Sequence, residues 1–106
     1  MATPDEVRDQ ILETLQGDIQ ATGTDATGAD TYATILTADS KKEHIYIYNG
    51  GTNGAIVSLD GTIDHFPIAG NSYAVFDNVD IAAGATIAAK NLSAGNNYTT
   101  LRVTIW

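Results

Sequence analysis

The hydrophobic pattern divides the chain into three parts. Residues 4–16 carry apolar side chains at helical spacing, residues 17–30 are small and polar, and residues 31–106 alternate apolar and polar positions over short runs. Alternation with a period of two places successive side chains on opposite faces of a β-strand. The pattern predicts an N-terminal helix and a flexible or extended arm over residues 1–30, followed by a β-sandwich domain over residues 31–106.

The helix is expected from Pro4 to about Gln16. Thr3 and Glu6 have the spacing of a capping box, and Pro4 suits the first helical position. An isolated helix of this length is marginal in water, so its apolar stripe must pack on a surface, either of its own domain or of a neighbouring subunit. The stripe consists of Val7, Ile11, Leu12 and Leu15.

The arm from Gly17 to Asp30 contains Ile19 as its only large apolar side chain. Burial of so little apolar surface cannot offset the entropy of ordering the segment. The arm is therefore interpreted as a flexible linker or as an extended segment that another surface holds.

Seven short strands are expected in the β domain, over residues 31–37, 43–49, 55–59, 62–66, 72–76, 85–90 and 99–106. In the second, His44, Tyr46 and Tyr48 share one face, and the isoleucines between them share the other. Asp60-Gly61 predicts a two-residue hairpin turn. Strands at intervals of roughly 8–12 residues with Gly and Asn turns predict a mainly β protein, an antiparallel β-sandwich or jelly-roll-like barrel.

Two corners share a sequence pattern: an apolar residue, alanine, a turn glycine, a polar residue and then a strand. They lie over residues 68–75 and 81–89. This pattern fits consecutive strands that enter opposite sheets, because glycine adopts the turn conformation at little cost.

Composition excludes several classes of function. The 106 residues include no cysteine, which removes disulfide scaffolds, thiolate zinc sites and thiol nucleophiles. The net charge of −8 opposes nucleic-acid binding, and no apolar run approaches the length of a membrane span. Up to Asp30 the chain holds seven acidic residues against Arg8 alone. This acidic segment is either a solvated face or an arm that lies over a basic or mixed surface of a partner.

Two short clusters contain ligands suited to a divalent cation. One is Asp60, Asp64 and His65, and the other is the Asp-Asn-Val-Asp segment at residues 77–80. However, adjacent strand residues point to opposite faces, and Asp and Asn are ordinary turn formers. We therefore expect turn and surface roles for both clusters, with no metal and no cofactor.

No residue set supports catalysis. His44 beside Glu43 has no nucleophile near it in sequence, and the glycine-rich loop at residues 50–54 lacks the lysine and helix of a phosphate loop. Tyr46, Tyr48 and Tyr73 form an aromatic set that either stacks on sugar rings or packs within the sheet and between subunits. The chain is expected not to be an enzyme.

The strands and corners from about Tyr46 to Trp106 resemble the small β-sandwich accessory proteins of tailed-bacteriophage virions. The likeness lies in the strand segments 47–49 and 55–59, the corners at 68–70 and 83–87, and the terminal strand 99–106. The resemblance implies a head-decoration or tail-accessory role, usually as homo-oligomers and often as trimers.

From the resemblance and the residues together we expect a structural capsid decoration protein, made in the host cytoplasm and placed on the virion surface. Its partners are the major coat protein and further copies of itself, with neither nucleic acid nor membrane. The helical stripe Val7, Ile11, Leu12 and Leu15 is expected to bind the coat protein, and Tyr46, Tyr48 and Trp106 to mediate self-association. The alternative is a carbohydrate-binding or tail-fibre adhesion module that uses Tyr46, Tyr48 and the 49–54 loop.

Overall fold

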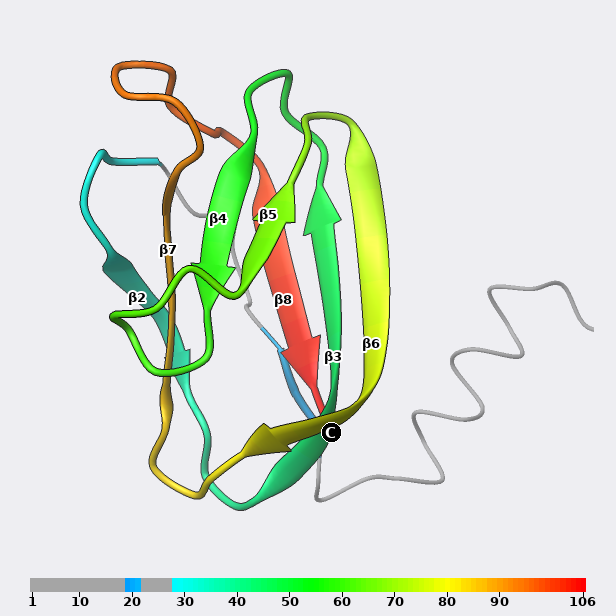
Figure 1. Cartoon of the computed structure of the whole chain (residues 1–106). Coiled ribbons are helices and arrows are strands. Elements are labelled where there is room, and N and C mark those ends of the chain that lie inside the picture. Colours follow the sequence, from blue (N-terminus) through cyan, green and yellow to red (C-terminus); the bar gives the residue numbers. More distant parts are fainter. Residues whose placement is uncertain (1–18, 22–27) are drawn as a thin grey trace, which may run out of the picture.

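The computed structural model describes residues 19–21 and 28–106. Its strands are β1 (Gln20–Ala21), β2 (Ala33–Thr37), β3 (Lys42–Asn49), β4 (Ala55–Ser58), β5 (Phe66–Ile68), β6 (Ser72–Ile81), β7 (Thr86–Asn91) and β8 (Leu101–Ile105). They form two four-stranded sheets that face each other, one in the order β1-β8-β3-β6 and the other in the order β2-β7-β4-β5 (Figure 1). The predicted mainly β sandwich is confirmed, whereas the predicted helix lies outside the described residues.

The strand pairs are nested. β1 pairs with β8, β2 with β7, β3 with β6 and β4 with β5, all antiparallel. Additional pairing of β3 with β8 and of β4 with β7 joins these hairpin-like pairs into the two sheets. This nested order, which wraps one long antiparallel ribbon into two sheets, is that of a jelly roll.

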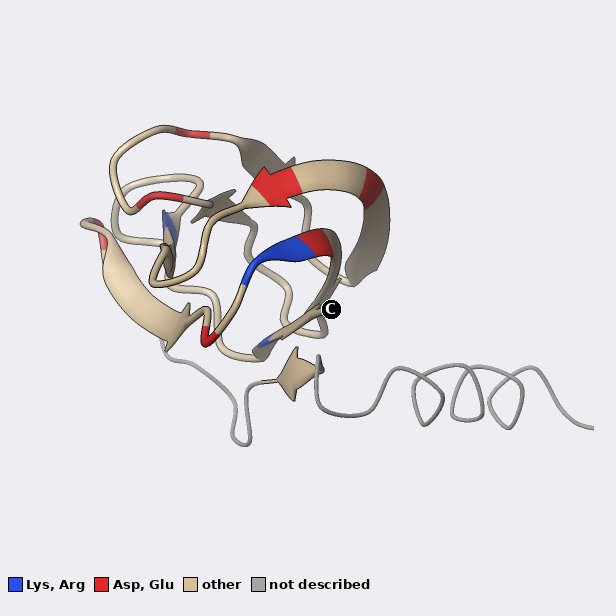
Figure 2. Cartoon of the chain, turned by 90° about the horizontal axis from the view of Figure 1, so that it is seen from below, with Lys and Arg blue, Asp and Glu red and all other residues tan. Residues whose placement is uncertain are grey.

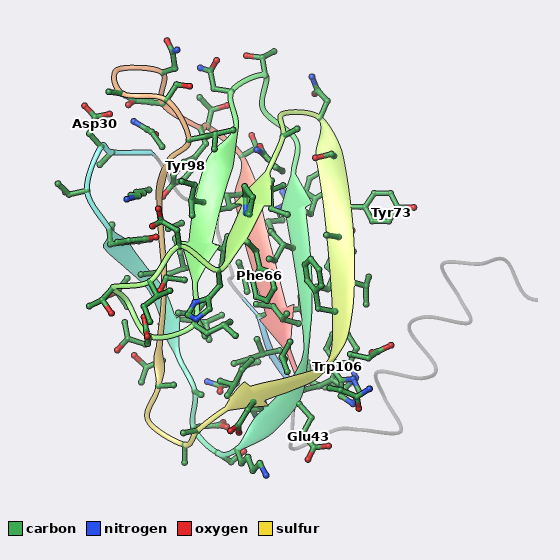
Figure 3. All side chains as sticks on the ribbon, in the orientation of Figure 1. Asp30, Glu43, Phe66, Tyr73, Tyr98 and Trp106 are labelled. Atoms are coloured by element: carbon green, nitrogen blue, oxygen red, sulfur yellow. The ribbon has the colours of Figure 1, made fainter. Side chains whose placement is uncertain are left out.

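The core lies between the two sheets and is formed by the side chains that point inward from the alternating strands. Figure 3 shows Phe66 directed into this space, where its ring stacks on Phe76 with a centroid separation of 4.2 Å. That contact joins β5 and β6, which belong to different sheets, and so closes one side of the sandwich. The fully buried apolar side chains are Ile45, Ile47, Ala55, Val57, Ile81, Ile87, Ala89, Tyr98, Leu101, Val103 and Ile105.

The two predicted corners carry the chain between the sheets. Residues 69–71 connect β5 to β6, and residues 82–85 connect β6 to β7. Asn71 and Gly84 have φ values of 54° and 83°, in the left-handed region that glycine and asparagine tolerate best. The expectation that both corners change sheet is therefore confirmed.

The predicted two-residue hairpin at Asp60-Gly61 is wrong. β4 ends at Ser58 and β5 begins at Phe66, so residues 59–65 form a longer loop. The Asp60 carboxylate accepts the N–H groups of Thr62 and Ile63 at 2.8 and 2.9 Å. These side-chain acceptors turn the backbone locally and replace the ladder bonds that a tight hairpin would form.

β6 is longer than predicted, because it continues past Phe76 to Ile81. Asn78 has a φ of 60°, and the pairing of β3 with β6 shifts register between Lys42 and His44. The Asp and Asn residues that resemble a turn in sequence therefore form an irregularity within a continuous strand.

The predicted arm contributes to the sandwich at both of its described segments. Gln20 and Ala21 pair with the end of β8, and Gly28 donates its N–H to the Tyr98 carbonyl at 2.8 Å. Asp30 accepts the Gly95 N–H and the Asn91 side-chain amide, each at 2.8 Å. The domain's own surface therefore holds these parts of the arm.

A buried amide connects the two loops at one end of the sandwich, and its loss should be costly. Asn49 is fully buried, donates to the carbonyls of Asn53 and Ala69, and accepts the Gly51 N–H. We expect Asn49→Ala to lower the free energy of unfolding by about 2–4 kcal/mol, because buried backbone groups lose their partners. The measurement is urea denaturation followed by circular dichroism.

Asn53→Ala is the matched control for this prediction. The Asn53 amide lies at the same end of the sandwich but makes one hydrogen bond, to the Asn97 carbonyl at 2.9 Å, and is partly exposed. We expect it to cost about 1 kcal/mol or less. Equal losses in the two variants would contradict the assigned role of Asn49.

Candidate functional site

The outer surface of the β1-β8-β3-β6 sheet carries three aligned rows of side chains. Strand register places Tyr48 between Arg102 and Tyr73, and Tyr46 between Thr104 and Val75. His44 pairs with Asp77 in the third row. Because β3 alternates, these side chains point outward while Ile45 and Ile47 point into the core. We call the set Tyr46, Tyr48, Tyr73 and Val75 the tyrosine face.

The tyrosine face is largely exposed to solvent, although its side chains are aromatic or aliphatic. Tyr48, Tyr73 and Val75 are 37%, 70% and 50% exposed. Figure 3 shows Tyr73 projecting away from the sandwich at β6. The rings of Tyr46 and Tyr73 lie 6.2 Å apart, so the aromatic surface continues across two strands. A contiguous apolar surface of this kind is typical of an interaction site.

The face is bounded at one end by Trp106. Its indole stacks on the His44 ring, with a centroid separation of 5.2 Å and an interplanar angle of 14°. His44 Nδ1 lies 2.8 Å from the Asp77 carboxylate, and the His44 and Trp106 backbones exchange hydrogen bonds. Tyr46, Tyr48 and Trp106, which were predicted to mediate self-association, therefore lie on one surface. Their role in self-association stays a prediction.

The other end of the face is bounded by the glycine-rich loop. A Cβ atom added to Gly50 would lie 2.7 Å from the Tyr48 hydroxyl, so this tyrosine packs directly over the glycine backbone. Asn49, which belongs to the segment proposed for sugar binding, is fully buried and holds the loop instead. The loop therefore supports Tyr48 and leaves the aromatic rings as the accessible groups.

The predicted coat-binding stripe of Val7, Ile11, Leu12 and Leu15 lies outside the described residues. Val75 lies at the centre of the tyrosine face, although it was not identified from the sequence as a candidate site residue. Its signal is its spacing of two from Tyr73, which places both side chains on the outer surface of one strand.

The sequence cluster at residues 60–65 disperses over separate contacts. Asp64 lies 3.2 Å from Lys90 Nζ and accepts the Tyr32 hydroxyl, while His65 Nδ1 accepts the Leu59 N–H. Within residues 19–21 and 28–106, no three His, Cys, Asp or Glu side chains are grouped to hold a metal ion. The same residues include no helix long and apolar enough to span a membrane.

Local hydrogen bonds and burial shift the pKa values of Asp60 in this loop and of Tyr32, which contacts the loop through Asp64. The backbone N–H groups of Ile63 and Thr62 hold the pKa of Asp60 well below its ordinary value. Burial, followed by the hydrogen bond to Asp64, raises the pKa of Tyr32. These shifts describe a carboxylate that anchors a loop and a tyrosine that stays neutral.

Comparisons with known proteins show the fold. No protein-family model and no curated protein matches the chain. A similar solved structure is a chain of the Bacillus endospore appendages, which form disulfide-linked pili. The match has a TM-score of 0.51 and 17% sequence identity, and it covers 84% of each chain. At this level of identity, the likeness concerns the fold alone.

The Asp60 contacts predict a specific dependence of stability on pH. Because the folded-state pKa is depressed, the stabilisation is present above the unfolded-state pKa of about 3.9 and is lost as the pH falls through the folded value. We expect Asp60→Asn to lose part of this dependence below about pH 4 and to be less stable than the parent at neutral pH.

Thermal unfolding at a series of pH values measures this effect. Asp80→Asn is the control, because it removes a carboxylate from the exposed part of β6 without altering the loop. Superimposable stability–pH profiles for the parent and Asp60→Asn would contradict the role of the carboxylate as a loop anchor.

Proposed function

We propose that the protein is a non-enzymatic structural subunit, a capsid decoration protein that binds a coat-protein shell as a homo-oligomer. The observation that carries the proposal is the exposed tyrosine face on a rigid sheet. Aromatic side chains are enriched in protein–protein interfaces, where they supply large contact areas at low entropic cost. The rings here project from paired strands, so their backbone positions on the sheet are set before binding.

The fold also supports a structural role. The Bacillus endospore appendages, whose chain shares this fold, are pili, so a jelly roll of this size serves in at least one extended assembly. Those pili are disulfide-linked, whereas this chain contains no cysteine. Disulfides of this chain therefore cannot hold its proposed assembly, and the tyrosine face supplies a noncovalent surface instead. The trimer implied by the phage resemblance is the copy number that we favour.

Self-association through the tyrosine face can be measured in solution. We expect the full-length chain to form a homo-oligomer in light scattering coupled to size-exclusion chromatography. The double variant Tyr48→Ser/Tyr73→Ser should raise the dissociation constant by about tenfold or more, because it removes two exposed aromatic anchors. Physiological salt is the appropriate medium, since each copy carries a net charge of −8.

The matched control is Ile63→Ser/Leu92→Ser, which removes two side chains that are 55% and 45% exposed on loops away from the face. It should leave the dissociation constant within about twofold of the parent value. A parent that stays monomeric at millimolar concentration would refute the self-association part of the proposal. The virion location is tested separately, by mass spectrometry of density-purified particles from the source culture, and absence of the chain there would refute it.

A second candidate function, glycan binding, is favoured by the pairing of Tyr48 with Tyr73. Two neighbouring exposed rings can stack on a sugar, and their hydroxyl groups can bond to it. If this reading is correct, a glycan array will give saturable binding to the monomeric protein, and Tyr48→Ala will abolish it while Leu92→Ala will not. Absence of binding across the array counts against this candidate and leaves the structural proposal unaffected.

A further inference from the structure

β6 is an edge strand, and its free side can be assigned residue by residue. His44 and Trp106 exchange backbone hydrogen bonds, and the Gly50 N–H donates to the Thr100 carbonyl. Even-numbered residues of β3 therefore direct their backbone groups to β8, and the odd-numbered residues direct theirs to β6.

The register then fixes β6. Ile45, Ile47 and Asn49 pair with Phe76, Ala74 and Ser72, which therefore direct their backbone groups back to β3. The intervening residues Tyr73, Val75 and Asp77 direct their N–H and C=O groups to the open side, where the sheet has no further strand among the described residues. Two of these three residues, Tyr73 and Val75, also belong to the tyrosine face.

β6 differs from the other sheet edges in length and in protection. β1 has two residues, β5 has three and includes Pro67, and β2 has five with a register shift. β6 has ten residues, and its first half contains no proline, lysine or bulge. Edge strands normally carry such features because they prevent pairing with another chain, so within the described part of the chain the first half of β6 is open to a further strand.

We infer that β6 pairs antiparallel with β6 of a second copy, about a two-fold axis at Val75. The inference deepens the proposed function, on which it rests, by naming one contact that joins two copies. In this register Val75 faces Val75, and Tyr73 faces Asp77 of the second copy. All three residues with free backbone groups are then paired, and both strands keep their existing bonds to β3.

Charge and strand geometry select this register. A shift of the axis to Phe76 would place Tyr73 opposite Val79, beyond the irregularity at Asn78. A shift to Asp77 would place two carboxylates opposite each other, and like charges directly opposite are destabilising. A shift in the other direction would run the pairing into the corner at residues 69–71 and leave Asp77 without a strand partner. The two acidic positions of β6, Asp77 and Asp80, lie in its C-terminal half, after Tyr73 and Val75 in the strand. Acidic segments of the ribbon are red in Figure 2. The Val75 axis keeps the two copies of Asp77 apart and faces each with a phenol that can donate to it.

The pairing would merge the two tyrosine faces into one aromatic surface across a continuous sheet. Because the contact is two-fold, it joins copies in pairs. A trimer held by other contacts would combine through it into a hexamer.

Cysteine cross-linking tests both the contact and its register, since the parent chain has no cysteine. A hydrogen-bonded antiparallel pair places the two Cα atoms about 5.5 Å apart, within the range that a disulfide spans. We expect Val75→Cys to form a covalent dimer under mild oxidation at least about tenfold faster than Ile63→Cys, because pairing raises the effective concentration of the thiols. Ile63 is a matched control, with 55% exposure against 50% for Val75.

Tyr73→Cys tests the register. Its two thiols would lie four residues apart along the strands, about 13 Å, and should cross-link no faster than the control. An equimolar mixture of Tyr73→Cys and Asp77→Cys should instead give the mixed dimer. Faster dimerisation of Tyr73→Cys than of Val75→Cys would overturn the register.

The contact itself is overturned if Val75→Cys dimerises no faster than Ile63→Cys. This result is distinguishable from failure of the proposed function, because the parent chain can still be oligomeric by light scattering and sensitive to the Tyr48/Tyr73 double variant. Val75→Lys provides a check without oxidation, since it places two cations together at the axis. It should lower the oligomer mass, whereas Ile63→Lys should not.

Discussion

The alternation of β3 is the constraint on which both the core and the candidate interface depend. This strand lies between β8 and β6, with Ile45 and Ile47 fully buried on one side and Tyr46 and Tyr48 on the other. A slip of one residue would exchange the two sets and expose the isoleucines to water. Packing of the core therefore fixes the register of the outer rows. The positions of the tyrosines on the outer surface depend on the burial of Ile45 and Ile47 on the opposite side of the same strand.

The sequence predicted those parts of the fold that follow from local periodicity. The opposite faces of β3, the mainly β architecture and the two corners that change sheet are all confirmed. The loop at residues 59–65 was not predictable from its Asp-Gly pair, because the outcome depends on which backbone groups the Asp60 carboxylate accepts. β1 is too short to give a pattern, and it exists because β8 offers it an edge.

The candidate site was predictable in part for the same reason. Tyr46 and Tyr48 stand out in a strongly alternating strand, and Trp106 follows from the alternation of the last strand. Val75 and the edge position of β6 could not be foreseen, since they depend on which strands become neighbours. The burial of Tyr98 was also not predictable from the sequence, because Gly28, which packs against its ring, lies 70 residues earlier in the chain.

An acidic protein with an open edge strand combines two opposed tendencies. A net charge of −8 repels other copies at long range, whereas the backbone groups of Tyr73 and Val75 attract any strand that comes close. Repulsion suppresses the many unregistered encounters that lead to aggregation. A pairing that keeps its carboxylates apart loses least to that repulsion and gains the full set of hydrogen bonds. The net charge opposes all contacts between copies alike, whereas the carboxylates on β6 penalise those strand registers that bring them opposite each other.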